Sequence, residues 1–134
     1  MISISELEKI ANERLADAEW LIKGQRVDSA IYLCGYCLEI AFKARLCKDA
    51  NRADFPETSP EFKLHNLKQW QTHSLTDLAK LCSIYGTIKK KHWQEWTLVQ
   101  TTWAVEIRYK ISAKTKEEAN DFINAIKVLL KVIL

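Results

Sequence analysis

Glycine and proline are scarce in this chain of 134 residues, which contains three Gly and two Pro. Because sheets built from many short strands need turn residues at most connections, this scarcity argues against a β-sandwich or a β-barrel. Long apolar runs are lacking as well, since the runs 128–130 and 132–134 are separated by Lys131 and are far too short to cross a bilayer. We therefore expect a helical protein without a membrane span.

The chain also lacks a strong charge of one sign. Its formal net charge is +3, which by itself is too small to indicate a nucleic-acid-binding protein. The excess of basic side chains falls in residues 86–134, so we expect an anionic partner to meet this part of the chain. Hydrophobic residues make up 48% and charged residues 28%, the balance of a soluble globular protein rather than a disordered one.

No signal-like segment precedes the four cysteines, three of which fall in one apolar stretch. A chain of this length can form a core without disulfides, so we expect reduced, buried thiols and a cytoplasmic protein. Cys34 and Cys37 have the spacing of half a zinc site, but Cys47, Cys82 and the three histidines supply no second close pair. We therefore predict no metal site and no cofactor.

Helical periodicity extends over most of the chain. Helices are expected over residues 5–23, 27–48, 74–86 (or from 72), 88–109 and 115–134, with a short helix at 62–70. Ser5 with Glu8, and Thr115 with Glu118, have the spacing of capping boxes at the first and last of these helices. A loop or insertion is expected at about 49–71, where Asn, Asp, Ser and Pro gather.

This pattern predicts one domain over residues 1–134. Its fold class is all-α, an antiparallel up-and-down helical bundle of four main helices plus a short fifth. The helix over 27–48 is apolar around most of its circumference, so it is expected at the centre of the bundle.

One narrow polar seam interrupts the apolar surface of this central helix. Asp28, Tyr32, Tyr36, Glu39 and Lys43 fall within about 80° of arc when successive residues are placed about 100° apart. Glu39 and Lys43 lie one turn apart in the order that favours an ion pair. The seam is either a solvated strip with an intrahelical ion pair, or the wall of a groove in which Glu39 orients a cation from another helix.

Arg108 is our candidate for that cation. It falls between the two apolar stripes of its expected helix, and a half-buried arginine needs an acidic partner, here Glu39 or Glu106. Beside Tyr109 at the edge of a groove, an arginine can also bind phosphate or stack on a base. His73, at the start of the next helix along the groove, is a further candidate member.

The polar seam and its surroundings resemble a known family, the prokaryotic HEPN domains. The matching segments are residues 14–21 and 28–44 for the first two helices, 72–75 with Leu78 and Leu81 for the opening of the third, and 106–109 for the arginine region of the fourth. The resemblance covers nearly the whole chain except the expected loop. It implies a helical bundle that forms homodimers, in a protein that cuts RNA, binds nucleotides or accompanies a minimal nucleotidyltransferase, as in toxin-antitoxin or defence modules.

Members of the family that cut RNA place a His one to two helical turns after the Arg. The resemblance implies that this His exchanges the 2′-hydroxyl proton while the Arg stabilises the charge on the phosphorane. Residues 109–115, which follow Arg108, contain no His. We therefore expect no catalytic residues in a non-catalytic HEPN-type domain that binds a nucleotide, RNA or a nucleotidyltransferase partner.

The expected groove consists of Glu39, Lys43, His73, Arg108 and Tyr109. The alternative function is a metal-independent ribonuclease in which Arg108 acts with a distant histidine, His73 or His92. In a third interpretation the seam is only a solvated face, and the protein is a structural interaction module.

Trp93 and Trp96 follow the basic run 89–91. Together these residues form either a basic patch with stacking aromatics or a solvated helix start beside core tryptophans. Five Trp in a chain of this size are more aromatic surface than one small core conveniently hides. With the resemblance, this predicts a homodimer, and Trp93 and Trp96 are the candidates for its interface.

Overall fold

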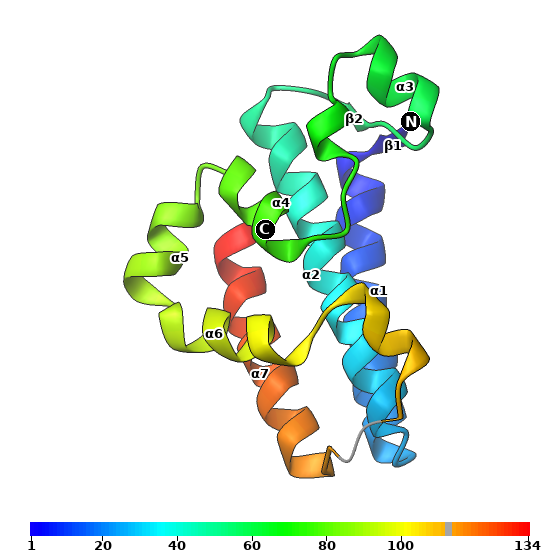
Figure 1. Ribbon diagram of the computed structural model, residues 1–134, viewed down its shortest axis with the longest axis vertical. Helices are drawn as coiled ribbons and strands as arrows, with labels where there is room; N and C mark the ends of the chain where they lie inside the picture. The colour runs from blue at the N-terminus through cyan, green and yellow to red at the C-terminus, as the bar shows by residue number, and fades with distance from the viewer. Residues whose placement is uncertain (112–113) are drawn as a thin grey trace.

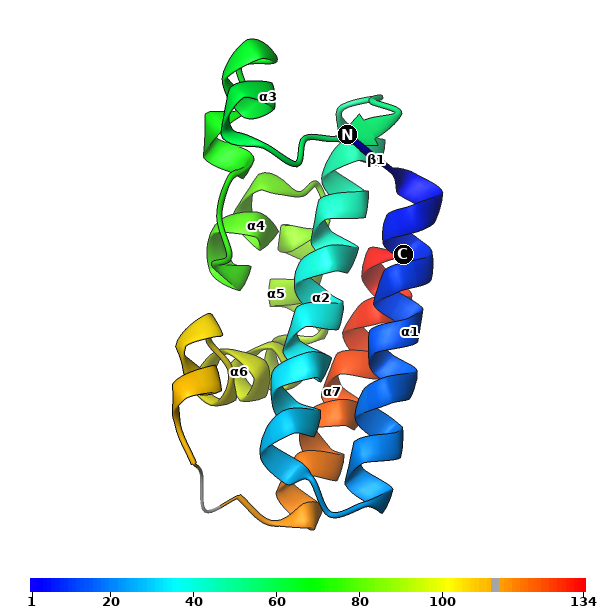
Figure 2. The ribbon, with the colours of Figure 1, turned by 90° about the vertical axis from the view of Figure 1, so that its right-hand side faces the viewer.

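Three long helices form the body of the protein. In the computed structural model, which describes residues 1–111 and 114–134, they are α1 (Ile4–Lys23), α2 (Val27–Asp49) and α7 (Lys116–Ile133). Each packs against the other two. Helices α2 and α7 run in the same direction and α1 runs opposite to both (Figures 1 and 2). The predicted all-α helical bundle is confirmed, with α2 at its centre.

A series of short helices takes the place of a fourth long helix. These are α4 (Leu75–Leu81), α5 (Tyr85–Lys91), α6 (Trp93–Thr102) and the 3₁₀ helix η2 (Val105–Tyr109). They lead the chain down one side of α2 and α7, toward the end of the bundle where α7 begins (Figure 1).

The prediction of long helices over 74–86 and 88–109 is therefore wrong. The chain leaves the helical conformation at His92, with φ −134° and ψ 32°, and becomes extended at Trp103, with φ −121° and ψ 135°. Trp96 and Trp103 are both buried, the first against Phe42 and Tyr85 and the second against Tyr36. Apolar periodicity continues across these breaks, which is why the sequence pattern did not reveal them.

The expected loop at about 49–71 is an ordered part of the fold. Strand β1 (Ile2–Ser3) pairs antiparallel with β2 (Asp54–Phe55), followed by α3 (Ser59–Leu64) and the 3₁₀ helix η1 (Lys68–Trp70). The one short helix expected at 62–70 is thus two. The rings of Phe55, Phe62 and Trp70 are buried against one another, with centroids 5.5 Å and 5.8 Å apart. These rings anchor a segment whose composition is otherwise that of a loop.

The sequence predicts the N-terminus of α7 correctly but places that of α1 two residues too late. The capping box at Thr115 and Glu118 is confirmed. At α1 the expected box of Ser5 and Glu8 is wrong, because Ser3 and Glu6 form it instead. Ser3 pairs with Asp54 in the β-ladder, and this pairing keeps its backbone extended, as an N-cap residue requires.

The four cysteines are free and buried, as expected. Burial raises the pKa of Cys47 to about 11 and that of Cys37 and Cys82 to about 12, so these thiols stay protonated at neutral pH. No group of three His, Cys, Asp or Glu in the described part of the chain could hold a metal ion. None of the helices in residues 1–111 and 114–134 is long and apolar enough to span a membrane.

Candidate ligand-binding groove along α2

Glu39 is the centre of the polar seam on α2. Its side chain is 1% exposed, and it accepts a hydrogen bond from Lys43 Nζ at 3.0 Å, which confirms the predicted ion pair. His73 Nδ1 lies 3.2 Å and 3.3 Å from the two carboxylate oxygens. Lys43 comes from the same helix, whereas His73 comes from the segment before α4. The buried carboxylate therefore joins α2 to an element far away in the sequence.

Only one ring nitrogen of His73, Nδ1, contacts Glu39, and the rest of the imidazole is accessible to solvent. Its side chain is 60% exposed although Nδ1 is bound to Glu39. A carboxylate at Nδ1 favours the tautomer that carries the proton there, which leaves the Nε2 lone pair for another partner. The Glu39–His73 pair thus presents an oriented imidazole to the surface.

Arg108 lies farther along the seam, beside the tyrosines of α2. Hydrogen bonds to Tyr32 and to Tyr109 raise the pKa of Arg108, and its guanidinium lies 4.7 Å from the centre of the Tyr109 ring. The expectation that Glu39 or Glu106 pairs with Arg108 is wrong, because the partners of Arg108 are Tyr32 and Tyr109 and Glu39 binds Lys43 and His73. The side chain of Arg108 is exposed because η2, which carries it, lies on the surface of α2 and has no buried residue.

Aromatic rings occupy the seam between Arg108 and His73. The rings of Tyr32 and Tyr36 meet edge to face at 5.1 Å, and Tyr36 meets Trp103 in the same way at 5.6 Å. Burial raises the pKa of Tyr36 to about 12, with a further contribution from its hydrogen bond to Tyr32. The phenol of Tyr36 is therefore neutral at physiological pH and acts as a hydrogen-bonding and stacking group.

Gly35 explains how η2 reaches this position. A Cβ atom at Gly35 would lie 2.1 Å from Nε1 of Trp103, so the indole rests directly on the backbone of α2. Its Nε1–H donates to the carbonyl oxygen of Tyr32 at 3.0 Å. The contact fixes the chain just before η2, and the sequence analysis did not include either residue in the site. A glycine inside a long helical pattern was the available signal, because it often marks a close approach.

A hollow of about 550 Å³ lies beside this contact. It is lined by residues 72–76, by Gln100 and by residues 103–106, so His73 faces Trp103 and Glu106 across it. At the rim, Thr76 Oγ1 donates to Gln100 Oε1 at 2.6 Å, which links α4 to α6. Arg108 does not line this hollow but follows it along the seam. Asp28, the first member of the seam, lies beyond Arg108 in a smaller hollow with Lys110 and Lys114.

The two exposed basic groups are held apart by their partners on α2. Tyr32, which contacts Arg108, and Glu39, which contacts His73, are seven residues apart. This corresponds to about 10 Å along the helix axis. The seam therefore presents two separate polar anchors with aromatic surface between them.

Of the two tryptophans expected at a dimer interface, only Trp93 lies at the surface. Trp96 is 2% exposed and packs against Phe42 and Tyr85, with ring centroids 5.9 Å and 6.4 Å apart, so it is not an interface residue. Trp93 is 52% exposed, and Trp20, to which no role was assigned, is 73% exposed.

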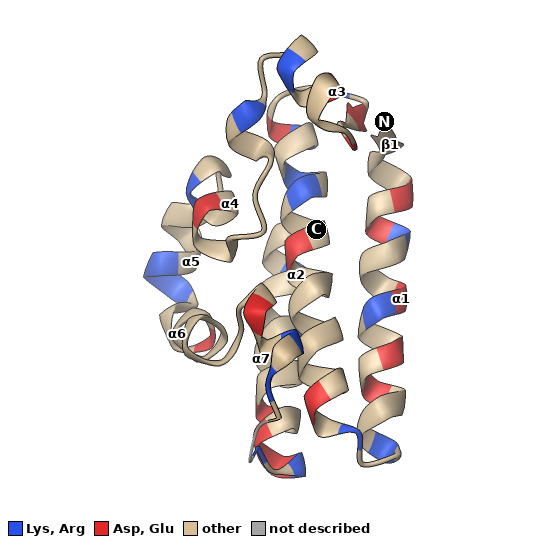
Figure 3. Ribbon diagram, turned by 45° about the vertical axis from the view of Figure 1, so that its right-hand side comes forward, with Lys and Arg blue, Asp and Glu red and all other residues tan. Residues whose placement is uncertain are grey.

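The basic run 89–91 forms the last turn of α5, on the side of the bundle away from α1 (Figure 3). It is therefore separate from the seam on α2. Since Trp96 is buried, Trp93 is the tryptophan that could add stacking surface to this basic patch.

Comparison of the chain with protein-family models, with curated proteins and with solved structures finds no match. The resemblance to HEPN domains therefore stays a prediction from the sequence. The function must be argued from the groove itself.

Proposed function

We propose that this protein is a non-catalytic, HEPN-type domain that binds a nucleotide or a short RNA segment along the polar seam of α2. The observation that carries the proposal is that Arg108 and His73 are held by Tyr32 and Glu39, two residues on one face of α2 about 10 Å apart along the helix axis. An extended anionic ligand with polar groups at both ends fits this spacing. A cytoplasmic location, a homodimer and a role in a toxin-antitoxin or defence module belong to the same proposal.

Each part of the seam has a role in this proposal. The guanidinium of Arg108 binds a phosphate, because its donors match the geometry of phosphate oxygens. The ring of Tyr109, exposed and next to that guanidinium, offers a face on which a base stacks. His73 Nε2 then contacts the sugar or a neighbouring phosphate, while Glu39, itself paired with Lys43, holds the imidazole in place.

Fluorescence anisotropy with a short, labelled single-stranded RNA tests the proposal, with AMP as the competitor. We expect Arg108→Gln to weaken binding about tenfold, since it removes a charge-assisted hydrogen bond. Arg14→Gln is the matched control, because Arg14 is an exposed arginine in an ion pair with Asp17 on α1. If both variants lost the same amount of RNA affinity, the binding would be general charge attraction and not recognition by Arg108. No binding of RNA or AMP by the unchanged protein would contradict the proposal and favour a protein partner, such as a nucleotidyltransferase.

The Glu39–His73 pair favours one alternative, a metal-independent ribonuclease. An imidazole oriented by a buried carboxylate is an arrangement used by general bases. A single scissile phosphate would have to lie within about 3 Å of both catalytic groups. The partners of Arg108 and His73 on α2, Tyr32 and Glu39, lie about two helical turns apart, which opposes this within one chain.

The two functions are separated by incubating the protein with a mixed RNA pool in EDTA. Under the binding proposal the RNA stays intact. Cleavage that is lost in both Arg108→Ala and His73→Ala, and kept in His92→Ala, would establish the ribonuclease instead. His92 is a suitable control because it lies between α5 and α6, away from the seam.

A further inference from the structure

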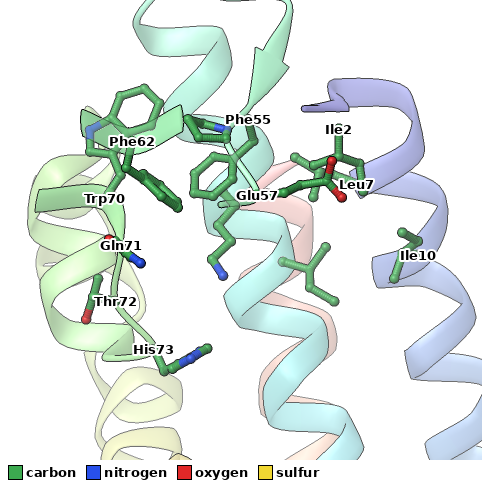
Figure 4. A pocket seen from close by; sticks show the side chains of 13 residues that line it. Ile2, Leu7, Ile10, Phe55, Glu57, Phe62, Trp70, Gln71, Thr72 and His73 are labelled. Carbon is green, nitrogen blue, oxygen red and sulfur yellow. The ribbon is translucent and has the colours of Figure 1, made fainter. Parts of the chain in front are cut away.

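A second hollow lies on the other side of the Glu39–Lys43 pair, between α1, α2 and the segment from β2 to His73 (Figure 4). Its volume is about 460 Å³, within the range of about 300–1,000 Å³ typical of small-molecule sites. Most of its wall is apolar, and the principal apolar residues are Ile2, Leu7, Ile10, Ile40, Phe55 and Trp70. The RNA-binding proposal shares Lys43 and His73 with this hollow and does not use its apolar wall.

Aromatic rings close one end of the hollow. Phe55 stacks on Trp70 with an angle of 15° between the ring planes, and Phe62 meets Phe55 edge to face. Figure 4 shows these three rings together, with Gln71, Thr72 and His73 along the neighbouring side. Flat ring systems pack well against such walls, because offset stacking and edge contacts add to the apolar area buried.

Lys43 supplies a cation to the lining of the hollow. Its Nζ is 3.0 Å from Glu39 Oε2 and 5.5 Å from the centre of the Phe55 ring. An ammonium group has three N–H donors, and the described contacts use one of them for a hydrogen bond. The remaining donors can serve a ligand in the hollow, which Lys43 lines.

The charged side chains around the hollow are each paired with an opposite charge. Lys43 and His73 share one carboxylate, that of Glu39. Glu57, the acidic residue that lines the hollow, is bound to the amino group of Met1 at 2.7 Å. Because Glu39 already offsets the charge of Lys43, we expect a ligand with no more than one negative charge, bound through the remaining N–H donors of Lys43.

We propose that this hollow binds a small amphipathic carboxylate with a flat aromatic body. The ring system lies between Ile10 and Ile40 and reaches the Phe55–Trp70 stack, and the carboxylate accepts hydrogen bonds from Lys43 Nζ. This inference does not depend on RNA binding, because the apolar wall that holds the ring system takes no part in the RNA-binding proposal.

Isothermal titration calorimetry with naphthoate, and with the uncharged naphthylmethanol of the same ring position, tests the site on the unchanged protein. We expect naphthoate to bind about tenfold more tightly than the alcohol, since only the carboxylate forms a charge-assisted hydrogen bond. In NMR spectra, bound naphthoate should shift the indole N–H signal of Trp70 and leave that of Trp93 unchanged.

Two variants extend the test. Lys43→Met should reduce the affinity for naphthoate to that for the alcohol, whereas Lys127→Met, which removes an exposed lysine paired with Glu19, should leave it unchanged. Equal binding of both probes by the unchanged protein would overturn the role of Lys43. The absence of binding by either probe, or a shift at Trp93 in place of Trp70, would overturn the site. Neither result requires the Lys43 variant to fold, and neither bears on RNA binding.

Discussion

The indole of Trp103 rests on Gly35, in the middle of the central helix. A Cβ atom at this glycine would meet the indole nitrogen at 2.1 Å, and the indole N–H donates to the neighbouring carbonyl group of Tyr32. The contact brings η2, and with it Arg108, onto the polar seam. One residue without a side chain thus determines where a candidate binding residue lies.

Replacing this glycine should separate η2 from α2. We expect Gly35→Ala to lower the free energy of unfolding by about 1–2 kcal/mol, because the steric cost exceeds the gain in helix propensity. Gly86→Ala is the matched control: Gly86 is also helical, nothing lies within 4 Å of its added Cβ, and the change should raise stability by about 0.5–1 kcal/mol. Urea denaturation measures both. Equal stabilisation by the two changes would show that the indole is not held as described.

Glu39 should be important for stability because it is buried with two basic partners. We expect Glu39→Gln to lower the free energy of unfolding by about 3 kcal/mol, since it leaves Lys43 without a compensating charge in a largely buried position. Asp17→Asn, which breaks the exposed pair with Arg14, should cost less than about 0.5 kcal/mol.

The ring nitrogens of His73 give a second measurement on the Glu39 variant. In the unchanged protein, nitrogen NMR should show the neutral imidazole protonated at Nδ1. In Glu39→Gln this preference should be lost. A tautomer that is the same in both proteins would contradict the proposed orientation of His73.

Asp49 should make the stability depend on pH. Burial alone would raise its pKa, but hydrogen bonds from the Ser83 backbone and hydroxyl and from Arg45 hold the pKa below its ordinary value. A carboxyl with a lowered pKa in the folded state stabilises the protein above its unfolded pKa of about 3.9, and the contribution is lost as the pH falls through the folded pKa.

We therefore expect Asp49→Asn to be less stable than the unchanged protein by about 1 kcal/mol at pH 7, with the difference shrinking below about pH 4. Thermal unfolding followed by circular dichroism at a series of pH values measures this difference. A difference that stays constant down to acidic pH would mean that the ionised carboxylate is not what joins α2 to the α4–α5 connection.

Trp93 remains our candidate for a dimer interface. If the protein is a dimer in solution, Trp93→Ala should shift it toward the monomer in multi-angle light scattering. Trp20→Ala removes a tryptophan that is even more exposed, on α1, and should leave the mass unchanged. A dimer that survives Trp93→Ala would place the interface elsewhere.

The features that the sequence predicted correctly depend on neighbours within a few residues. The ion pair of Glu39 and Lys43 and the cap formed by Thr115 and Glu118 are separated by four and three positions. Helical geometry alone brings such residues together, so their spacing was sufficient. The features that were predicted wrongly, such as the partner of Arg108 and the interface role of Trp96, depend on contacts between distant segments.

The sequence by itself determined the all-α class, the three long helices, the polar seam on α2 and the burial of the cysteines, because each follows from the periodicity of apolar residues. Only the tertiary structure decided that residues 74–109 break into short helices, that His73 and not Arg108 meets Glu39, and that the 49–71 segment closes a hollow. These outcomes depend on which apolar surfaces are buried together in three dimensions. A helical period is the same whether a tryptophan is buried, as Trp96 is, or exposed, as Trp20 is.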